Sequence, residues 1–182
     1  KLIPIGAGLG GGSADAAFML KLLSNEFQLF LEDNILEDYA SQLGSDCTFF
    51  INNSPAIATG TGTALEPIDL DLSGLYLLVT NPGIHVSTSQ AYSGVVPQKS
   101  ITDLTELLLT KDFVRWQKEL VNDFELSLFD QYSSLSAIKD QLYQNGAVYA
   151  SMSGSGSTMF GLFTNKPVIK TEENWVIKEF IL

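Results

Sequence analysis

The sequence contains very little cysteine, histidine or positive charge. Of its 182 residues, one is a cysteine (Cys47) and one is a histidine (His85). A single cysteine excludes an intrachain disulfide framework and fits a reducing compartment, so we expect a cytoplasmic protein. A lone histidine is most often structural or exposed, and we assign no role to His85.

The acidic charge balance argues against a nucleic-acid partner. Ten Lys and Arg stand against 21 Asp and Glu, giving a net charge of −11. Because the basic residues form no cluster, we expect no nucleic-acid partner. No apolar run is long enough for a membrane span, and the first residues do not resemble a signal peptide. We therefore expect a soluble intracellular protein. An acidic protein can still bind a nucleotide if backbone amides and a metal ion provide the local positive charge.

Hydrophobic periodicity predicts alternating helices and short strands. The expected helices lie at about 13–25, 33–43, 88–92 and, in three or four pieces, 102–145. The expected strands lie at 47–51, 55–59, 75–80, 148–152, 158–163 and, at a sheet edge, 174–182. Residues 66–74 resemble a linker, so we expect domains over 1–70 and 74–182. The second half, with its strands before and after a run of helices, is predicted to be an α+β sandwich.

The most informative segment is the glycine-rich stretch at residues 4–14. The candidate ligand-binding residues there are Pro4, Gly6, Gly8, Leu9, Gly10, Gly11, Gly12, Ser13 and Ala14. Glycine tolerates positive φ and lets backbone amides approach an anion closely. A helix beginning near Ser13 directs free N–H groups and its positive dipole end toward that anion. This pattern predicts a site for the phosphates of a nucleotide.

Other interpretations of this stretch fit less well. Gly6, Gly8 and Gly11 match the dinucleotide pattern G-x-G-x-x-G, with Glu32 about twenty residues later, but Pro4 is unsuited to the central strand that this motif requires. In a P-loop, Gly12 would occupy the place of the essential lysine. A plain glycine-rich turn is a further alternative. Asp15 is expected in the first helical turn, where its carboxylate would stabilise the helix N-terminus. This structural role competes with a role in binding the ligand.

The stretch Pro-Ile-Gly-Ala-Gly-Leu-Gly-Gly-Gly-Ser-Ala-Asp-Ala-Ala at 4–17 resembles the phosphate-binding motif of the GHMP small-molecule kinases. Two other segments support the resemblance. Leu-Gly-Ser-Asp at 43–46 is similar to the family's segment with the catalytic aspartate, and Ser-Gly-Ser-Gly-Ser at 153–157 is similar to its third, glycine-rich motif. The Asn-Pro-Gly and Val-Ser-Thr segments at 81–88 resemble the start of the family's second domain.

The resemblance implies a fold, two cofactors and roles for particular residues. The implied fold class is α+β and GHMP kinase-like, with part of a ribosomal-protein-like α/β domain followed by a ferredoxin-like α+β sandwich. The cofactors would be ATP and Mg²⁺, with the hydroxyl of Ser13 on a phosphate or the metal. Asp46 would accept or orient the proton of the attacking hydroxyl; a structural cap in its turn is the alternative. Thr88 would lie on the side of the family's pocket that binds the phosphoryl acceptor, although capping of helix 88–92 explains this residue equally well.

One branch of the family matches the triple glycine and its Ser-Ala-Asp-Ala-Ala continuation. This implies phosphorylation of the 2-hydroxyl of 4-diphosphocytidyl-2-C-methyl-D-erythritol, in non-mevalonate isoprenoid precursor synthesis. The alternatives are a homoserine or mevalonate type of the same family, or a non-catalytic nucleotide-binding fragment. Because the family's N-terminal segment with its lysine does not occur here, we expect residues 1–182 alone to have little or no activity. The sequence leaves the oligomeric state open.

Overall fold

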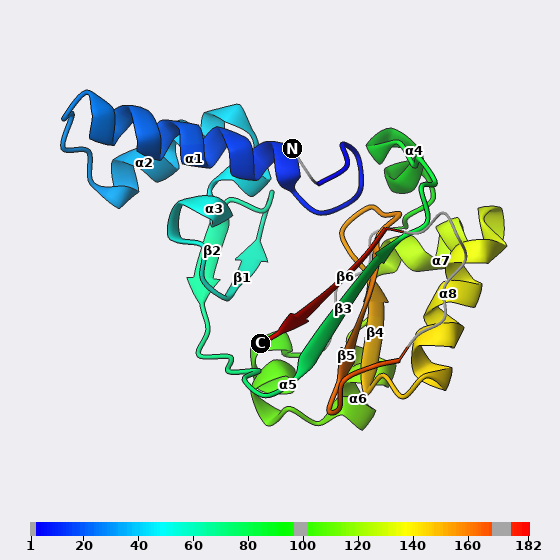
Figure 1. The fold of residues 1–182 in the computed structure, drawn as a ribbon. Coiled ribbons are helices and arrows are strands. Elements are labelled where there is room, and N and C mark those ends of the chain that lie inside the picture. Colours follow the sequence, from blue (N-terminus) through cyan, green and yellow to red (C-terminus); the bar gives the residue numbers. More distant parts are fainter. Residues whose placement is uncertain (1–2, 97–101, 169–175) are drawn as a thin grey trace. The chain divides into compact units, whose positions relative to one another are not determined.

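The computed structural model describes residues 3–96, 102–168 and 176–182. The chain forms two compact units. We call Gly10–Leu70 the helical unit, and Lys1–Leu9 together with Asp71–Leu182 the sheet unit. The sheet unit is thus built from two separate stretches of the chain (Figure 1).

The helical unit packs its helices around a small apolar core. Its elements are α1 (Gly11–Glu26), α2 (Asp33–Leu43), the 3₁₀ turn η1 (Ser45–Cys47), α3 (Phe49–Asn52), β1 (Ala56–Thr59) and β2 (Ala64–Pro67). The buried core residues are Ala17, Leu36, Ala40, Cys47 and Ile51. The predicted helix at 33–43 is confirmed with the same bounds.

One predicted strand of this unit is wrong. Residues 47–51 form the end of η1 and most of α3 instead of a strand. Cys47 and Ile51 are four residues apart, so a helical turn puts both side chains on the side that faces the core. The strand predicted at 55–59 is confirmed as β1, but it pairs with β2 across the turn at Gly60 and Gly62.

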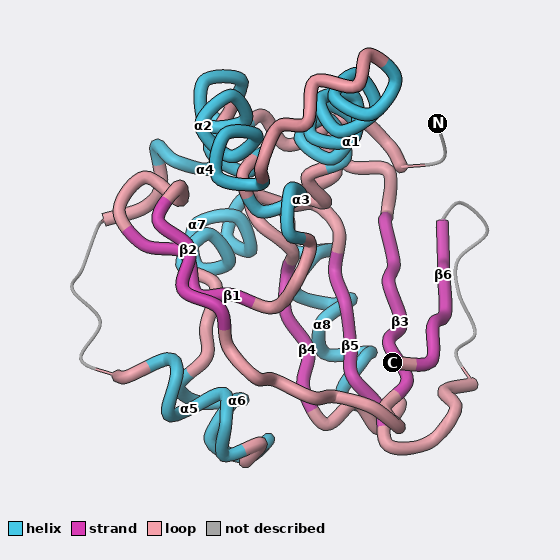
Figure 2. The backbone as a smooth tube through the Cα atoms, turned by 90° about the vertical axis from the view of Figure 1, so that its left-hand side faces the viewer, coloured by secondary structure: helices cyan, strands magenta, loops and turns pink. Residues whose placement is uncertain are grey.

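The described part of the sheet unit forms a four-stranded antiparallel sheet in the order β4-β5-β3-β6 (Figure 2). The strands are β3 (Tyr76–Asn81), β4 (Tyr149–Met152), β5 (Met159–Phe163) and β6 (Val176–Ile181). The predicted strands at 75–80, 148–152 and 158–163 are therefore confirmed to within a residue or two. The expected edge strand is β6, and the first residues of its predicted range, 174–175, lie outside the described residues.

Helices cover this sheet and complete its core. They are α4 (Thr88–Ser93), α5 (Leu104–Thr110), α6 (Phe113–Glu119), α7 (Asp123–Gln131) and α8 (Ser133–Gln144), so the region 102–145 contains four helices, as predicted. Leu128 of α7 and Ile138 of α8 pack into one buried cluster with Leu78, Ala150 and Met159 of the strands. Figure 1 shows α7 and α8 on one side of the sheet.

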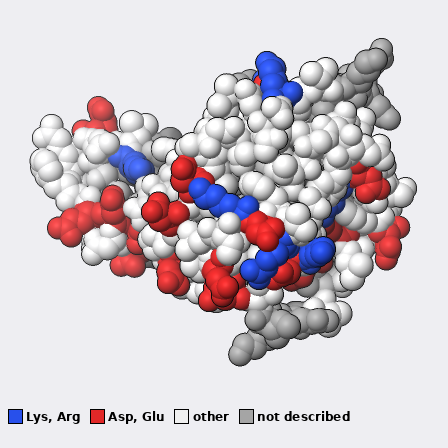
Figure 3. Space-filling view, turned by 90° about the horizontal axis from the view of Figure 1, so that it is seen from below, with Lys and Arg blue, Asp and Glu red and all other residues white. Residues whose placement is uncertain are grey.

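Among the described residues, no helix is both long and apolar enough to cross a lipid bilayer. On the face drawn in Figure 3, basic side chains lie beside acidic ones, and that face carries no continuous basic area.

Candidate functional site

The first part of the glycine-rich stretch, residues 3–9, is an irregular loop of the sheet unit. Gly6 and Gly8 have φ angles of 70° and 75°, a region that favours glycine. Pro4 is exposed and lies outside the strands. The dinucleotide interpretation, which requires a buried strand at this position, is therefore wrong.

Gly8 is packed tightly against the second glycine-rich segment, the loop 153–157. The Oγ–H of Ser153 donates a hydrogen bond to the carbonyl oxygen of Gly8 at 2.7 Å. The N–H of Thr158 donates to the carbonyl oxygen of Ala7 at 3.2 Å. A Cβ at position 8 would lie 2.1 Å from the carbonyl oxygen of Ser153, so the fold itself requires glycine there. The two motifs that the sequence singled out are thus in direct contact within one unit.

These two hydrogen bonds determine where the neighbouring amides point. In a trans peptide the C=O and the following N–H point in opposite directions. Because the carbonyls of Ala7 and Gly8 face Thr158 and Ser153, the N–H groups of Gly8 and Leu9 face away from them. Within the described ranges, no atom accepts a hydrogen bond from either N–H. Two adjacent amide donors are thereby available to an anion.

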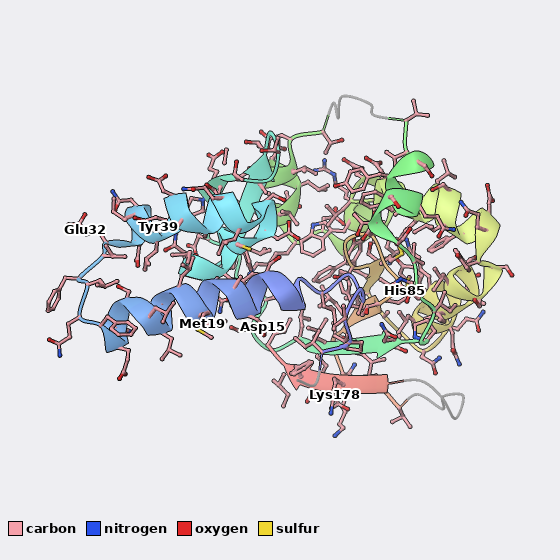
Figure 4. All side chains as sticks on the ribbon, turned by 90° about the horizontal axis from the view of Figure 1, so that it is seen from above. Asp15, Met19, Glu32, Tyr39, His85 and Lys178 are labelled. Carbon is pink, nitrogen blue, oxygen red and sulfur yellow. The ribbon has the colours of Figure 1, made fainter. Side chains whose placement is uncertain are left out.

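The second part of the stretch begins α1 in the helical unit. Gly10 is the N-cap residue with a φ angle of 60°, and the ring of Phe50 lies 3.0 Å from the position of its missing Cβ. The helix begins at Gly11, two residues before the expected start, so Asp15 lies beyond its first turn (Figure 4). The proposed role of Asp15 in that first turn is therefore wrong, because the turn contains no acidic residue. The α1 helix instead presents Gly11, Gly12 and Ser13 in its first turn.

Gly12 differs from Gly6, Gly8 and Gly10 of the same stretch. Its φ angle is not positive, and no described atom lies within 4 Å of the position of a Cβ there. Neither backbone conformation nor packing explains why this residue lacks a side chain. A glycine in a first helical turn that faces open space is suited to the close approach of a ligand.

Asp46 lies in η1, in the same unit as the first turn of α1. Its side chain is exposed, whereas the following residues Cys47 and Thr48 are buried. No hydrogen bond or ion pair from any described residue engages its carboxylate, and η1 has no side-chain cap. The alternative of a structural cap is therefore wrong, and the carboxylate is accessible to a substrate.

Thr88 is the first residue of α4, and it is exposed. The cap of this helix is Ser87, whose Oγ accepts from the N–H of Gln90 at 3.1 Å. Capping therefore does not explain Thr88, and in the part of the chain that is described its hydroxyl has no partner. His85, which Figure 4 labels, precedes α4 in the same connection, and its Cε1 lies 3.2 Å from the position of a Cβ at Gly6.

Sequence reasoning missed two polar residues at the start of α7. Asn122 donates to the carbonyls of Met152 and Gly154, which flank Ser153. Glu125 accepts from the N–H of Met152. Their spacing, Asn-x-x-Glu, is a helix-start signature. That signature predicts a local cap and contains no information about contacts with residues thirty positions away.

Comparisons with known proteins indicate the family of the chain. The family model described as GHMP kinases N terminal domain matches residues 1–60, and the one described as GHMP kinases C terminal matches residues 104–180. The chain is 50% identical over 174 residues to 4-diphosphocytidyl-2-C-methyl-D-erythritol kinase of Parabacteroides distasonis, covering 96% of this chain and 64% of that protein. It is 51% identical over 164 residues to the Bacteroides fragilis kinase of the same name, covering 90% of this chain and 60% of that protein. The chain thus spans somewhat over half the length of these curated relatives.

Solved structures show the same fold. A crystal structure of 4-(cytidine 5'-diphospho)-2C-methyl-D-erythritol kinase superposes with a TM-score of 0.72 at 32% identity, over 89% of this chain and 59% of that one. Homoserine kinase from Cytophaga hutchinsonii superposes with a TM-score of 0.71 at 17% identity, over 100% of this chain and 67% of that one. The expected α+β, GHMP kinase-like fold class is confirmed. By its two matching domain models and its relatives, the chain belongs to the GHMP kinases.

Proposed function

We propose that this protein is a small-molecule kinase that phosphorylates the 2-hydroxyl of 4-diphosphocytidyl-2-C-methyl-D-erythritol with ATP, a step of isoprenoid precursor synthesis. The names of its relatives at about 50% identity support the substrate. The observation that carries the reaction class is the orientation of the loop at 6–9. There Ser153 and Thr158 hold two carbonyls and so leave the amides of Gly8 and Leu9 available to phosphate.

The residues of the glycine-rich stretch suit a nucleotide. In this proposal the amides from Gly8 to Ser13 bind the β- and γ-phosphates, and Pro4, Gly6 and Ala14 shape the ends of the segment. The open position at Gly12 fits a closely approaching phosphate. Bound ATP supplies the phosphoryl group, and Mg²⁺ lowers its negative charge. The hydroxyl of Ser13, in the first turn of α1, would hold a phosphate oxygen or the metal.

Asp46 would act on the acceptor. Its carboxylate is exposed and has no partner among the residues that the structure describes, so it is able to accept or orient the proton of the attacking hydroxyl. Such a contribution is typically worth about 10²–10⁴-fold in rate. Thr88, whose exposed hydroxyl is not used as a cap, would contact the acceptor.

The proposal also includes the domain bounds and the cellular compartment of the protein. We assign residues 1–70 to the N-terminal domain of the family and 74–182 to its C-terminal domain. The cytoplasm is the compartment that fits a chain whose single cysteine, Cys47, is buried and unpaired.

The test is Asp46→Asn in the full-length protein, with coupled ATP turnover on the cytidyl substrate. We expect turnover to fall at least about 100-fold, while the Kd for ATP stays within about twofold, because the change removes a proton acceptor and keeps the shape of the side chain. Asp38→Asn, at another exposed aspartate of the helical unit, is the matched control and should leave turnover unchanged. Normal turnover by the Asp46 variant would refute its role.

A substrate panel tests the rest of the proposal. Turnover with homoserine or mevalonate in place of the cytidyl substrate would assign the protein to another type of the family. Failure of the full-length protein to bind ATP would favour a non-catalytic role.

A further inference from the structure

We infer that Asn122 is a positioning residue for the phosphate-binding amides, acting through the loop 153–157. The inference rests on the proposed function, because it assigns a role to these amides in ATP binding. The residues at the start of α7 bind the end of β4 and have no part in the proposed reaction itself.

Asn122 binds both residues that flank Ser153. Its Nδ2 donates to the carbonyl oxygens of Met152 and Gly154, each at 2.8 Å. Its Oδ1 accepts from the N–H of Phe124 at 3.0 Å, which caps α7. The carboxamide therefore joins the start of a helix to the two peptide groups on either side of Ser153.

Glu125 strengthens this attachment from the same helical turn. Its side chain is buried, and one carboxylate oxygen accepts from the N–H of Met152 at 2.7 Å and from the Oγ–H of Ser151 at 3.1 Å. The other oxygen is paired with the ammonium group of Lys139. Met152 is thus held at its N–H by Glu125 and at its carbonyl by Asn122, on the side of the edge strand β4 that has no neighbouring strand among the described residues.

The attachment continues from Ser153 to the phosphate-binding loop. Ser153 donates to the carbonyl of Gly8 at 2.7 Å, and a Cβ at Gly154 would lie 3.1 Å from that same carbonyl oxygen. The position of Ser153 therefore determines the plane of the Gly8–Leu9 peptide and the direction of the Leu9 N–H. Asn122 holds the carbonyls of Met152 and Gly154, the residues before and after Ser153. Loss of its two N–H donors therefore lets Ser153 move, and with it the Gly8–Leu9 peptide group can rotate.

Two substitutions separate this role from helix capping. Asn122→Asp keeps an oxygen for the N–H of Phe124 and so keeps the cap, but it cannot donate to either carbonyl. Asp112→Ala is the control, because it removes the cap of α6, at the N–H groups of Val114 and Arg115, and touches neither glycine-rich loop.

The experiment measures steady-state kinetics and amide hydrogen exchange in the full-length protein. For Asn122→Asp we expect the KM for ATP to rise about 10-fold or more, while the KM for the cytidyl acceptor stays within twofold. We also expect faster exchange in peptides covering residues 3–9 and 153–158 without any nucleotide. Asp112→Ala should change neither the KM for ATP nor the exchange in these peptides.

A double-mutant cycle with Ser153→Ala tests whether Asn122 acts through Ser153. If it does, the two changes together should raise the KM for ATP no more than the stronger of them alone. Additive effects, an unchanged KM for ATP, or unchanged exchange at 3–9 in Asn122→Asp would each overturn the inference. If the unmodified protein failed to turn over ATP, the proposed function would fail, and the exchange measurement would still decide the attachment of the loop to α7.

Discussion

Replacing Gly12 with alanine should increase stability and weaken ATP binding at the same time. Gly12 is the second residue of α1, it has no positive φ angle, and no described atom comes within 4 Å of a Cβ placed there. Alanine is favoured over glycine inside a helix by about 0.5–1 kcal/mol. Because the position lies in the first turn, we expect a gain in unfolding free energy of about 0.5 kcal/mol.

The loss in binding follows from the same geometry. A methyl group in the open space at Gly12 would occupy the volume through which a phosphate reaches the amides of the first turn. A hydrogen bond to a charged group contributes about 1.5–3 kcal/mol, so loss of one such contact weakens binding by about 10–100-fold. Titration calorimetry gives the Kd for ATP, and urea unfolding gives the free energy of unfolding.

Two further variants make this experiment decisive. Asn25→Ala lies in the same helix, about 20 Å from Gly12 at 1.5 Å per residue, and should stabilise α1 without changing the Kd for ATP. Gly8→Ala should lower the stability, because its Cβ would lie 2.1 Å from the carbonyl oxygen of Ser153. If Gly12→Ala bound ATP as tightly as the unmodified protein, the first turn of α1 would not contact the nucleotide, and the proposed site would be wrong.

Two other predictions concern stability and local opening. Burial raises the pKa of Tyr149 to about 12, above the value of about 10 in an unfolded chain. The stabilising contribution of the buried, neutral hydroxyl is therefore fully present below pH 10 and is lost as the pH rises toward 12. The loss amounts to about 2–3 kcal/mol by urea unfolding, and an equally steep decline in Tyr149→Phe would contradict this cause. Cys47 is 3% exposed, so we expect thiol reagents to label it at least about 100-fold more slowly than in denaturant; equal rates would show that the core of the helical unit is open.

Local patterns in the sequence predict much of the fold correctly. The helix at 33–43 and the strands of the sheet unit follow from apolar spacing and from nearby stop signals such as Gly44 and Gly146. The segment 47–51 was predicted wrongly because a run of aromatic and apolar residues favours a strand. The spacing of four between Cys47 and Ile51 was the available signal for a helical turn.

The candidate site was predictable in its residue types and only partly in its geometry. The glycine-rich stretch and Asp46 are recognisable because each belongs to its own short motif, at 4–17 and at 43–46, that can be read from neighbouring residues. The hydrogen bond from Ser153 to Gly8 joins residues 145 positions apart, and no local pattern predicts such a pairing. For the same reason Asn122 was missed, since its signature describes a helix start and its partners lie on a distant loop.

The division of the sheet unit into two separate stretches has a consequence for synthesis of the chain. Residues 3–9 reach the conformation that orients their amides only when Ser153 and Thr158 are available to hold them. A ribosome makes these partners about 145 residues after Gly8, which at ~5–20 residues per second takes on the order of ten seconds. During that interval residues 3–9 have been synthesised but lack the two hydrogen bonds that orient their amides. If these amides bind ATP as proposed, a nascent chain acquires that affinity late, after β4 and β5 have emerged.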